Sequence, residues 1–470
     1  MRLRRLALFG VLLATTFLGL FDHDLWAPDE PRAAELGHEF LFEGRSWAVP
    51  TLNGRPFVEK PPLVYWTIAV SLNVFGVGDG AARVPCILFA WGTLLFVWLL
   101  ARRLYGGDSG EASALVTATT AGFLLATHHV ESDVGLIFFT TGAAYFLRRA
   151  FEGSSWWYGA AALAALGAFF SKGFIGFVFP GLLWITWIFW TRSPRELLRA
   201  RPWIWLPLLA IPITAWLCAL RVDPRGDLLR AFWVENHLDR FLGTRGDEDR
   251  GQRHGPWYYL LQLPVMAAPW IVALGFAARW IWSRRAERPE RFLLSWFLAG
   301  FLFLSVAGTK RAIYLVPLLP PLAILIGGWI SSLHRRRWLE PAAVSLTAAL
   351  GMAWFFVVSP VNEKRTFRPF CRKMERVLPK GVKLYGYDAD ETTRAVVPFY
   401  TGRNFQELST ERQLDVLASE AKGPVAVITV DVRGKTWHSD QVRARFPNLW
   451  LGMEADRPHR LQVFCNVPLR

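Results

Sequence analysis

Long apolar runs separated by arginine clusters constrain this chain more than any other feature. About 11 runs are long enough to span or nearly span a bilayer, near residues 6–21, 84–101, 112–127, 134–147, 156–170, 174–190, 203–220, 257–278, 292–307, 312–333 and 339–359. An upright membrane helix needs roughly 20 apolar residues, and several runs are shorter, so their ends are approximate. Hydrophobic residues make up 53% of the chain, above the roughly 45–50% usual in soluble proteins. We expect an α-helical polytopic membrane protein with about 11 or more transmembrane helices.

The arginine clusters give the orientation. Arg2–Arg5 precede the first run, and the positive-inside rule places them in the cytoplasm. If the runs then alternate, every strong cluster falls on the cytoplasmic side: Arg102-Arg103, Arg148-Arg149, Arg284-Arg285 and Arg335-Arg336-Arg337. Loop 22–83 and the chain after Pro360 are then outside. The net charge of +15 therefore reflects topology and contacts to acidic lipids rather than nucleic-acid binding.

One apolar stretch, Pro62 to Val77, does not fit as a span. Counting it would move Arg102-Arg103 and every later cluster to the outside. We therefore predict an interfacial helix from Leu63 to Phe75, with Tyr65 and Trp66 at headgroup level. Two prolines directly before it suit a first helical turn.

The composition changes after Pro360. Strand-like runs such as 425–430 and 461–464 are separated by glycines, and helices are plausible near 370–378 and 409–421. This predicts two parts, a membrane part over residues 1–360 that includes loop 22–83, and a small soluble α/β domain over residues 361–470. Cys371 and Cys465 either pair as a disulfide, if this domain faces an oxidising compartment, or remain free thiols.

The predicted topology brings a set of polar residues to the outer face, each in or next to an outward loop. They are Asp22, Asp24, Asp29, Glu30, Arg32, Glu59, Lys60, His128, His129, Glu131, Asp133, Lys172, Glu235, Asn236, His237, Arg240, Lys310, Arg311 and Tyr314. Charged groups at a membrane boundary are costly, so such crowding points to a site. A carboxylate that accepts a hydroxyl proton, with Lys and Arg around an anionic leaving group, suits transfer from a lipid-linked phosphate.

Several of these residues also have a purely structural interpretation. Asp29 and Glu30 can cap a short helix, and Asp133 can be the N-cap of the run from Val134. Lys172 can extend to water along an apolar surface.

Three other positions leave similar choices open. Glu59 either pairs locally with Lys60 or joins His237 in binding a divalent cation. Tyr314 can belong to the aromatic belt of the interface. Lys310-Arg311 lies on the outer side against the positive-inside pattern, which favours a functional role.

Specific motifs resemble one family. The segments Leu25-Trp26-Ala27-Pro28-Asp29-Glu30-Pro31-Arg32 and Glu59-Lys60-Pro61-Pro62 resemble the first periplasmic loop of bacterial membrane glycosyltransferases of the GT-C superfamily. Within it the chain is most similar to the aminoarabinose (lipid A) transferase and protein O-mannosyltransferase-like family. Further matching motifs are Ala81-Ala82-Arg83-Val84-Pro85, Ser171-Lys172-Gly173, 232–241 and 310–321.

The resemblance implies a GT-C fold in the bacterial inner membrane and transfer of a sugar from a polyprenyl (undecaprenyl) phosphate to a lipid, protein or glycan acceptor on the periplasmic face. It implies Asp29 and Asp133 as catalytic carboxylates, and contacts to the donor phosphate from Arg32, Lys60, Lys172, Arg240 and Tyr314. Lys310 joins these phosphate contacts through its charge on the outer face. Glu59 and His237 are where a divalent metal ion is possible, and no other cofactor is implied. Asn236 departs from the family, which has a carboxylate there.

A transporter or flippase of a lipid-linked sugar is the alternative function. Transporters commonly show repeated halves and broken helices at the membrane midplane. Here the polar groups gather at span ends on one face, and the sequence shows no internal repeat, so we favour chemistry over passage.

Overall fold

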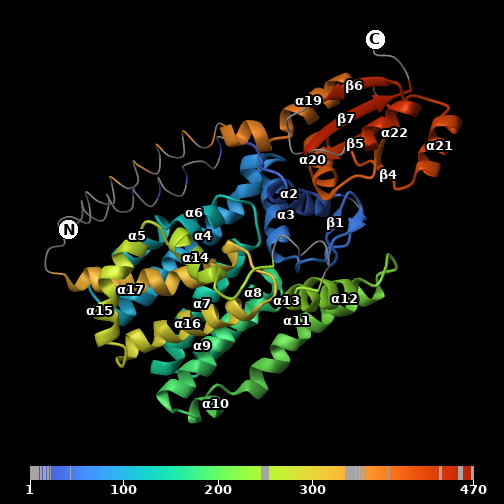
Figure 1. The fold of residues 1–470 in the computed structure, drawn as a ribbon. Coiled ribbons are helices and arrows are strands. Elements are labelled where there is room, and N and C mark those ends of the chain that lie inside the picture. The colour runs from blue at the N-terminus through green and yellow to red at the C-terminus, as the bar shows by residue number, and fades with distance from the viewer. Residues whose placement is uncertain are drawn as a thin grey trace.

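The computed structural model describes residues 23–42, 44–244, 253–333, 360–378, 381–432, 437–453 and 459–466, and isolated positions between Gly10 and Phe21 and between Ser345 and Val358. Within these ranges a helical body holds α4 to α17, and a five-stranded sheet with its helices stands at one end (Figure 1). The short helices α2 (Asp29–His38) and α3 (Leu63–Phe75) lie between the two (Figure 1). The first and last predicted spans lie mostly outside the described residues.

The helical body follows from the apolar runs. Its main helices are α4 (Asp79–Tyr105), α5 (Ser109–Ala118), α6 (Ala121–Thr127), α7 (Asp133–Glu152), α8 (Trp156–Lys172), α9 (Ile175–Thr191), α11 (Pro202–Val222), α14 (Tyr258–Met266), α15 (Ile271–Ser283), α16 (Arg288–Val306) and α17 (Leu319–Ser332). Short helices connect them: η1 (Glu39–Leu41), α10 (Arg195–Arg199), α12 (Leu228–Arg230), η2 (Ala231–Leu238), α13 (Asp239–Leu242) and η4 (Ala312–Leu318).

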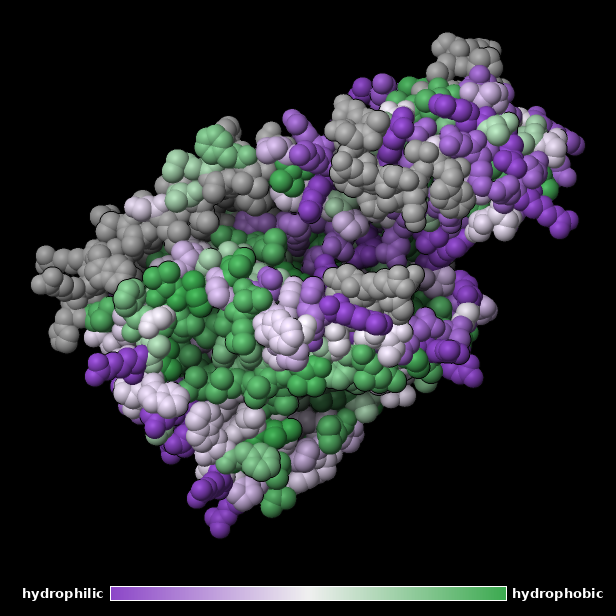
Figure 2. Space-filling model, viewed as in Figure 1, coloured by the Kyte–Doolittle hydropathy of each residue, from purple (hydrophilic) through white to green (hydrophobic). Residues whose placement is uncertain are grey.

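Four stretches of described helix are long and apolar enough to cross a membrane: Asp79–Tyr105, Pro202–Val222, Arg288–Val306 and Ala312–Ser332. A fifth is possible if α14 and α15, bent by 108°, form one broken span. The fold is thus a polytopic membrane fold. Figure 2 shows why: hydrophobic side chains cover much of the helical body, while hydrophilic ones gather over the sheet and in the recess beside it.

Close packing in the helical body depends on small residues where helices touch. A Cβ at Gly327 of α17 would lie 2.1 Å from Ser113 Oγ of α5. Such a contact excludes any larger residue, so glycine is what lets these two helices approach.

The predicted interfacial helix is present as α3, from Leu63 to Phe75, and Pro62 directly precedes its first turn. Its buried side chains, among them Val64, Ile68 and Leu72, share an apolar cluster with α2. The helix therefore forms part of the loop structure instead of adding a span to the helical body.

The sheet has the strand order β4-β3-β5-β7-β6. Its strands are β3 (Lys383–Tyr387), β4 (Gln406–Leu408), β5 (Val425–Val432), β6 (Asn448–Gly452) and β7 (His459–Cys465). β3 pairs in parallel with β4 and β5, with Lys383 opposite Val425, whereas β7 runs antiparallel to β5 and β6. The helices are α19 (Arg368–Val377), α20 (Glu391–Thr401), α21 (Glu411–Glu420) and α22 (Trp437–Arg445). The predicted strands and helices of this part are thus present.

Cys371 and Cys465 are both buried in one apolar cluster of this part, and no disulfide joins them. Of the two alternatives that the sequence left open, the structure has the one without a disulfide. The thiol of Cys371 donates instead to the carbonyl oxygen of Val396 at 3.6 Å.

A short hairpin of β1 (Thr51–Leu52) and β2 (Arg55–Pro56) links the first loop to the sheet. Asn53 in its turn donates from its amide to the carbonyl oxygen of Phe405 at 3.0 Å and accepts from the Phe405 N–H at 3.1 Å. The C-terminal part is therefore bound directly to the loop that carries the candidate site.

Candidate active site

Asp29 is the first residue of α2. Its Oδ1 accepts from Arg32 at 2.6 Å, one turn along the same helix, and its Oδ2 lies 3.5 Å from Arg311. Burial raises the pKa of Asp29, but the nearby charges of Arg32, Arg311 and Lys60 outweigh it and lower the pKa below its ordinary value. Asp29 is therefore an ionised carboxylate surrounded by cations.

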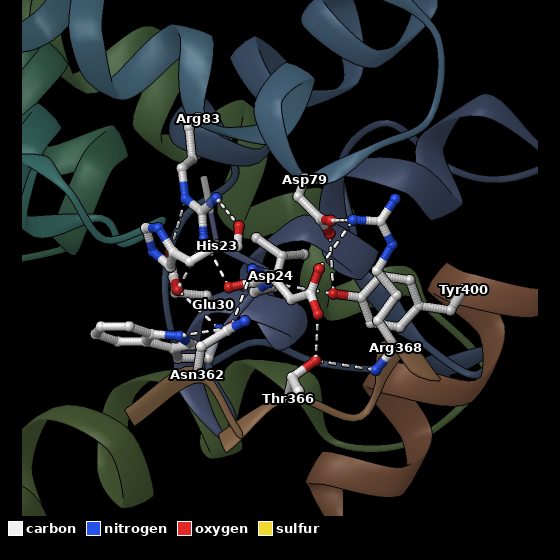
Figure 3. A network of polar contacts seen from close by, with 11 residues as sticks. His23, Asp24, Glu30, Asp79, Arg83, Asn362, Thr366, Arg368 and Tyr400 are labelled. Atoms are coloured by element: carbon white, nitrogen blue, oxygen red, sulfur yellow. Dashed lines mark hydrogen bonds and ion pairs between the residues drawn. The ribbon is translucent and has the colours of Figure 1, made fainter. Parts of the chain in front are cut away.

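Glu30 anchors the same turn. It is fully buried, and Arg83 of α4 donates to both of its oxygens at 3.2 Å (Figure 3). Arg83 also donates to the carbonyl oxygens of His23 and Asp24, and Glu30 accepts from the N–H of Val130 at 3.1 Å. The pair thus joins the first loop, α4 and the loop before α7, which the cap interpretation of Glu30 had not included.

Asp133 and Lys172 meet across two helices. Asp133 is the first residue of α7 and Lys172 the last of α8, and the ammonium donates to the carboxylate. Lys172 Nζ also lies 4.9 Å from the centre of the Tyr314 ring. Lys172 is thus held inside the site and does not extend to water, and Asp133 has a partner beyond the helix end.

Glu131 belongs to the outer polar set, but no local pattern marks it as a site residue. Its carboxyl group lies close enough to those of Asp29 and Asp133 for the three to alter one another's pKa. Burial, and then the charge of Asp133, raise the pKa of Glu131 to about 7. Three carboxyl groups so close together share protons more readily than they all ionise, because like charges repel.

A cavity of about 240 Å³ opens beside these groups. Its lining includes seven predicted positions, namely Glu59, Lys60, Asp133, Lys172, His237, Arg240 and Tyr314. Apolar lining residues come mainly from α9 and α16: Ile175, Val178, Phe179, Phe303 and Leu304. Among the described residues, Asp29, Arg32 and Lys310 do not line it. The cavity thus combines charged groups that suit an anion with apolar side chains that suit a hydrocarbon chain.

Lys60 and Arg240 place positive charge along the cavity. Lys60 is half-buried, and its removal from water lowers its pKa below the ordinary value although the charges of Glu131 and Glu59 oppose the shift. Arg240 lies 3.6 Å from Glu59. Glu59 thus lies near a second cation, Arg240, besides Lys60, which follows it in the sequence.

The residues Glu59 and His237 fit a metal ion poorly. His237 Nδ1 donates to the carbonyl oxygen of Phe232 at 2.7 Å, and its Nε2 faces the backbone of Gly173, where an added Cβ would lie 2.1 Å away. The described residues contain no group of three or more His, Cys, Asp or Glu arranged to hold a metal. No step below is assigned to a metal.

Lys310 does not line the cavity. Its ammonium donates to the carbonyl oxygens of His254, at 3.0 Å, and Ala307. Its neighbour Arg311 is the cation that faces Asp29. Of the outer charge pair Lys310-Arg311, Arg311 is thus the residue that lies near Asp29.

Comparisons with known proteins agree with these motifs. Residues 59–218 match the family described as dolichyl-phosphate-mannose-protein mannosyltransferase. An undecaprenyl phosphate-alpha-4-amino-4-deoxy-L-arabinose arabinosyl transferase of Pseudomonas fluorescens is 30% identical over 73% of this chain and 62% of its own length. One of Pseudomonas aeruginosa is 30% identical over 75% of this chain and 65% of its own length. The matches thus span less than two thirds of these relatives.

The fold is shared with a solved structure. The crystal structure of ArnT from Cupriavidus metallidurans bound to undecaprenyl phosphate superimposes with a TM-score of 0.81 at 19% identity, covering 98% of this chain and 97% of that one. The likeness extends over the sheet as well as the helical body. The chain is therefore similar in sequence to these arabinosyl transferases and has the fold of that solved structure.

Proposed function

We propose that this chain is an integral membrane glycosyltransferase that moves a sugar from a polyprenyl phosphate, such as undecaprenyl phosphate, to a hydroxyl group of an acceptor. The observation that carries the proposal is the cavity near Asp29, which is lined by cations and carboxylates together with apolar side chains of α9 and α16. The names of the relatives, which are arabinosyl transferases that use undecaprenyl phosphate, support the same donor class.

In the proposed reaction, the acceptor oxygen attacks the anomeric carbon of the donor sugar. A new glycosidic C–O bond forms, the bond from that carbon to the phosphate oxygen breaks, and polyprenyl phosphate leaves with the electron pair. The acceptor proton passes to Asp29, which is ionised and near the cavity. Asp133, fixed by Lys172, is the second catalytic carboxylate.

We assign the leaving phosphate to the cations that line the cavity. Lys60, Lys172 and Arg240, with the hydroxyl of Tyr314, line the cavity and would stabilise the charge that develops on the phosphate. An Arg supplies two parallel donors and a Lys a point charge, so the combination suits a tetrahedral anion. Arg32 and Arg311 instead contact Asp29.

The orientation is also part of the proposal. Residues 1–360, with about 11 spans, would form the membrane unit in the bacterial inner membrane, with a cytoplasmic N-terminus. Loop 22–83 and the α/β domain of residues 361–470 would face the periplasm. In a Cys218→Ser background, an impermeant maleimide should label a cysteine at exposed Gly402 in intact cells, and label one at exposed Arg285 only after lysis. The reverse pattern would overturn this orientation.

The direct test of the activity uses the purified protein with a panel of polyprenyl-phosphate sugars and candidate lipid, glycan and peptide acceptors. Mass spectrometry should detect a glycosylated acceptor and released polyprenyl phosphate. Movement of an intact lipid-linked sugar across vesicles, without cleavage, would favour a flippase instead.

A further inference from the structure

The Arg32 guanidinium is shared by two carboxylates from opposite ends of the chain. Its Nη2 donates to Asp29 at 2.6 Å, and its Nη1 donates to Glu391 Oε2, also at 2.6 Å, although Glu391 is 359 residues away. Arg32 is 15% exposed and Glu391 46% exposed. The bridge therefore runs from the α/β part, through a mostly buried cation, to the candidate catalytic carboxylate.

Glu391 is the first residue of α20, and Ala395 and Phe399 of this helix share an apolar cluster with α2 and α3 of the first loop. Its N-cap Asp390 accepts from the N–H of Thr393 at 2.8 Å. At the other end, Tyr400 donates to Asp79 at 2.9 Å and accepts from the N–H of Leu25 at 3.2 Å (Figure 3). The helix cannot rotate without breaking these bonds, so the position of Glu391 is fixed.

The residues just before Asp29 are held by the same part of the chain. Asn362 accepts from the N–H of Asp24 and from Trp26 Nε1, both at 3.1 Å. Arg368 donates to Asp24 at 2.8 Å and to Asp79 at 2.7 Å (Figure 3). The contact between Glu391 and Arg32 thus belongs to a fixed interface and is not an isolated surface pair, which would contribute little.

We propose that Glu391 is a positioning residue for Asp29: it holds the Arg32 guanidinium in a shared bridge, so that Arg32 does not fully neutralise Asp29. The physical reason is that one positive charge divided between two carboxylates stabilises each of them less than it would stabilise one. For the transfer reaction, which is itself the proposed function above, the consequence is that Asp29 remains a stronger base.

Other charges that face Asp29 act alongside this bridge. They are Arg311 from the loop before η4, Lys60 from the loop before α3, Glu131 and His129 from the loop before α7, and Tyr65 of α3. Glu59, from the loop before α3, acts on Arg32 itself and raises its pKa. None of these residues forms part of the Arg32 bridge to Glu391, so a change at residue 391 leaves them in place. The effect of Glu391 can therefore be measured by substitution.

The experiment is an infrared pH titration of Asp29, isolated as the difference between each protein and its Asp29→Asn counterpart. Glu391→Gln keeps the shape and removes the charge, so the midpoint of Asp29 should fall by roughly half a pH unit, since Glu391 is partly screened by water. Glu391→Asp, which keeps the negative charge, should return the Asp29 midpoint most of the way to the wild-type value. Glu420→Gln, an exposed carboxylate on α21, is the matched control and should leave the midpoint unchanged.

A double substitution tests the route through Arg32. Arg32→Lys replaces the forked guanidinium with a single ammonium that cannot bridge both carboxylates in the same way, so adding Glu391→Gln to it should produce little further change. The proposal is overturned if Glu391→Gln, folded as judged by its unfolding temperature, leaves the Asp29 midpoint where it was. It is also overturned if the shift persists in full with Lys at position 32.

Kinetics separate this inference from the proposed function. If the wild type transfers sugar, Glu391→Gln should lower kcat about two- to five-fold and move the acid limb of its pH profile downward, with the donor KM little changed. A shifted Asp29 midpoint in a protein that transfers no sugar from any donor would remove the proposed function but leave the bridge established. Normal transfer with no shift in the Asp29 midpoint would support the proposed function and overturn the role of the bridge.

Discussion

Arg83 Nε lies 3.2 Å from Glu30 Oε1, and neither side chain has any exposed surface. The two residues are on different elements, Glu30 in the first turn of α2 and Arg83 in α4. Through the additional bonds of Arg83 to the backbone of residues 23 and 24, this pair sets the path of the loop that presents Asp29.

Replacing Arg83 by Met should destabilise the protein strongly, because it leaves the Glu30 carboxylate buried without its cation. Losing one partner of a buried pair typically costs about 3 to 5 kcal/mol. Thermal unfolding of the detergent-purified protein should show a large fall in melting temperature. Arg225→Met, which removes a more exposed pair with Asp223, is the control and should cost below about 1 kcal/mol. Equal shifts for the two variants would contradict the anchoring role of Arg83.

Lys60 and Lys310 should behave differently when each is replaced by Met. Lys60 lines the cavity, so its loss should weaken binding of undecaprenyl phosphate about ten-fold or more, with little loss of stability. Lys310 donates to two backbone carbonyls, so its loss should cost about 1 to 3 kcal/mol of unfolding free energy and change affinity less. Titration by tryptophan fluorescence measures the affinities. An equal loss of affinity in both variants would restore Lys310 as a phosphate contact.

Glu131 should make the stability of the protein pH-dependent. Its pKa is raised from 4.5 to about 7, so the folded chain binds this proton more tightly than the unfolded chain does. The resulting stabilisation is complete below pH 4.5 and is lost as the pH rises to about 7, amounting to about 3 kcal/mol.

Glu131→Gln should therefore flatten the pH dependence of the melting temperature between pH 4.5 and 7. Glu235→Gln, at an exposed position, should leave it as in the wild type. A Glu131→Gln protein with an unchanged slope would show that the three neighbouring carboxyl groups do not share a proton at this position.

The apolar side chains of the cavity should select for the lipid chain of the donor. Val178 of α9 lines the cavity, and Val178→Trp would fill part of the cavity's volume of about 240 Å³. The KM for a long-chain polyprenyl donor should rise about ten-fold, while that for a donor with one or two isoprene units should change little. Ile185→Trp, on the same helix but 46% exposed, is the control. A KM that rises equally for both donors would place the lipid chain elsewhere.

Much of the fold could be predicted because it depends on short-range patterns. Apolar runs indicate helices, and the argument that excluded 62–77 as a span also predicted α3 with its observed ends. The sidedness that the arginine clusters indicate stays a prediction, but it grouped Lys60, Asp133 and Lys172, which line one cavity. Alternation of apolar residues likewise indicated β5 and β7.

The missed features depend on contacts between distant residues. Nothing local to Glu391 or Asn362 indicates that α20 and the segment before it lie against the loop at Asp29. Lys310 and Arg311 are adjacent and both cationic, so only the path of the backbone decides which one faces Asp29. Glu131 differs from other loop carboxylates only through the approach of Asp29 and Asp133, which the sequence leaves undetermined.

The most direct test of the account is single-turnover transfer by Asp29→Asn, with donor affinity measured on the same sample. The account predicts a loss of about 10²- to 10⁴-fold in the rate of transfer, with undecaprenyl phosphate bound within two- or three-fold of the wild type and an unchanged melting temperature. Transfer at the wild-type rate by a folded Asp29→Asn protein would contradict it.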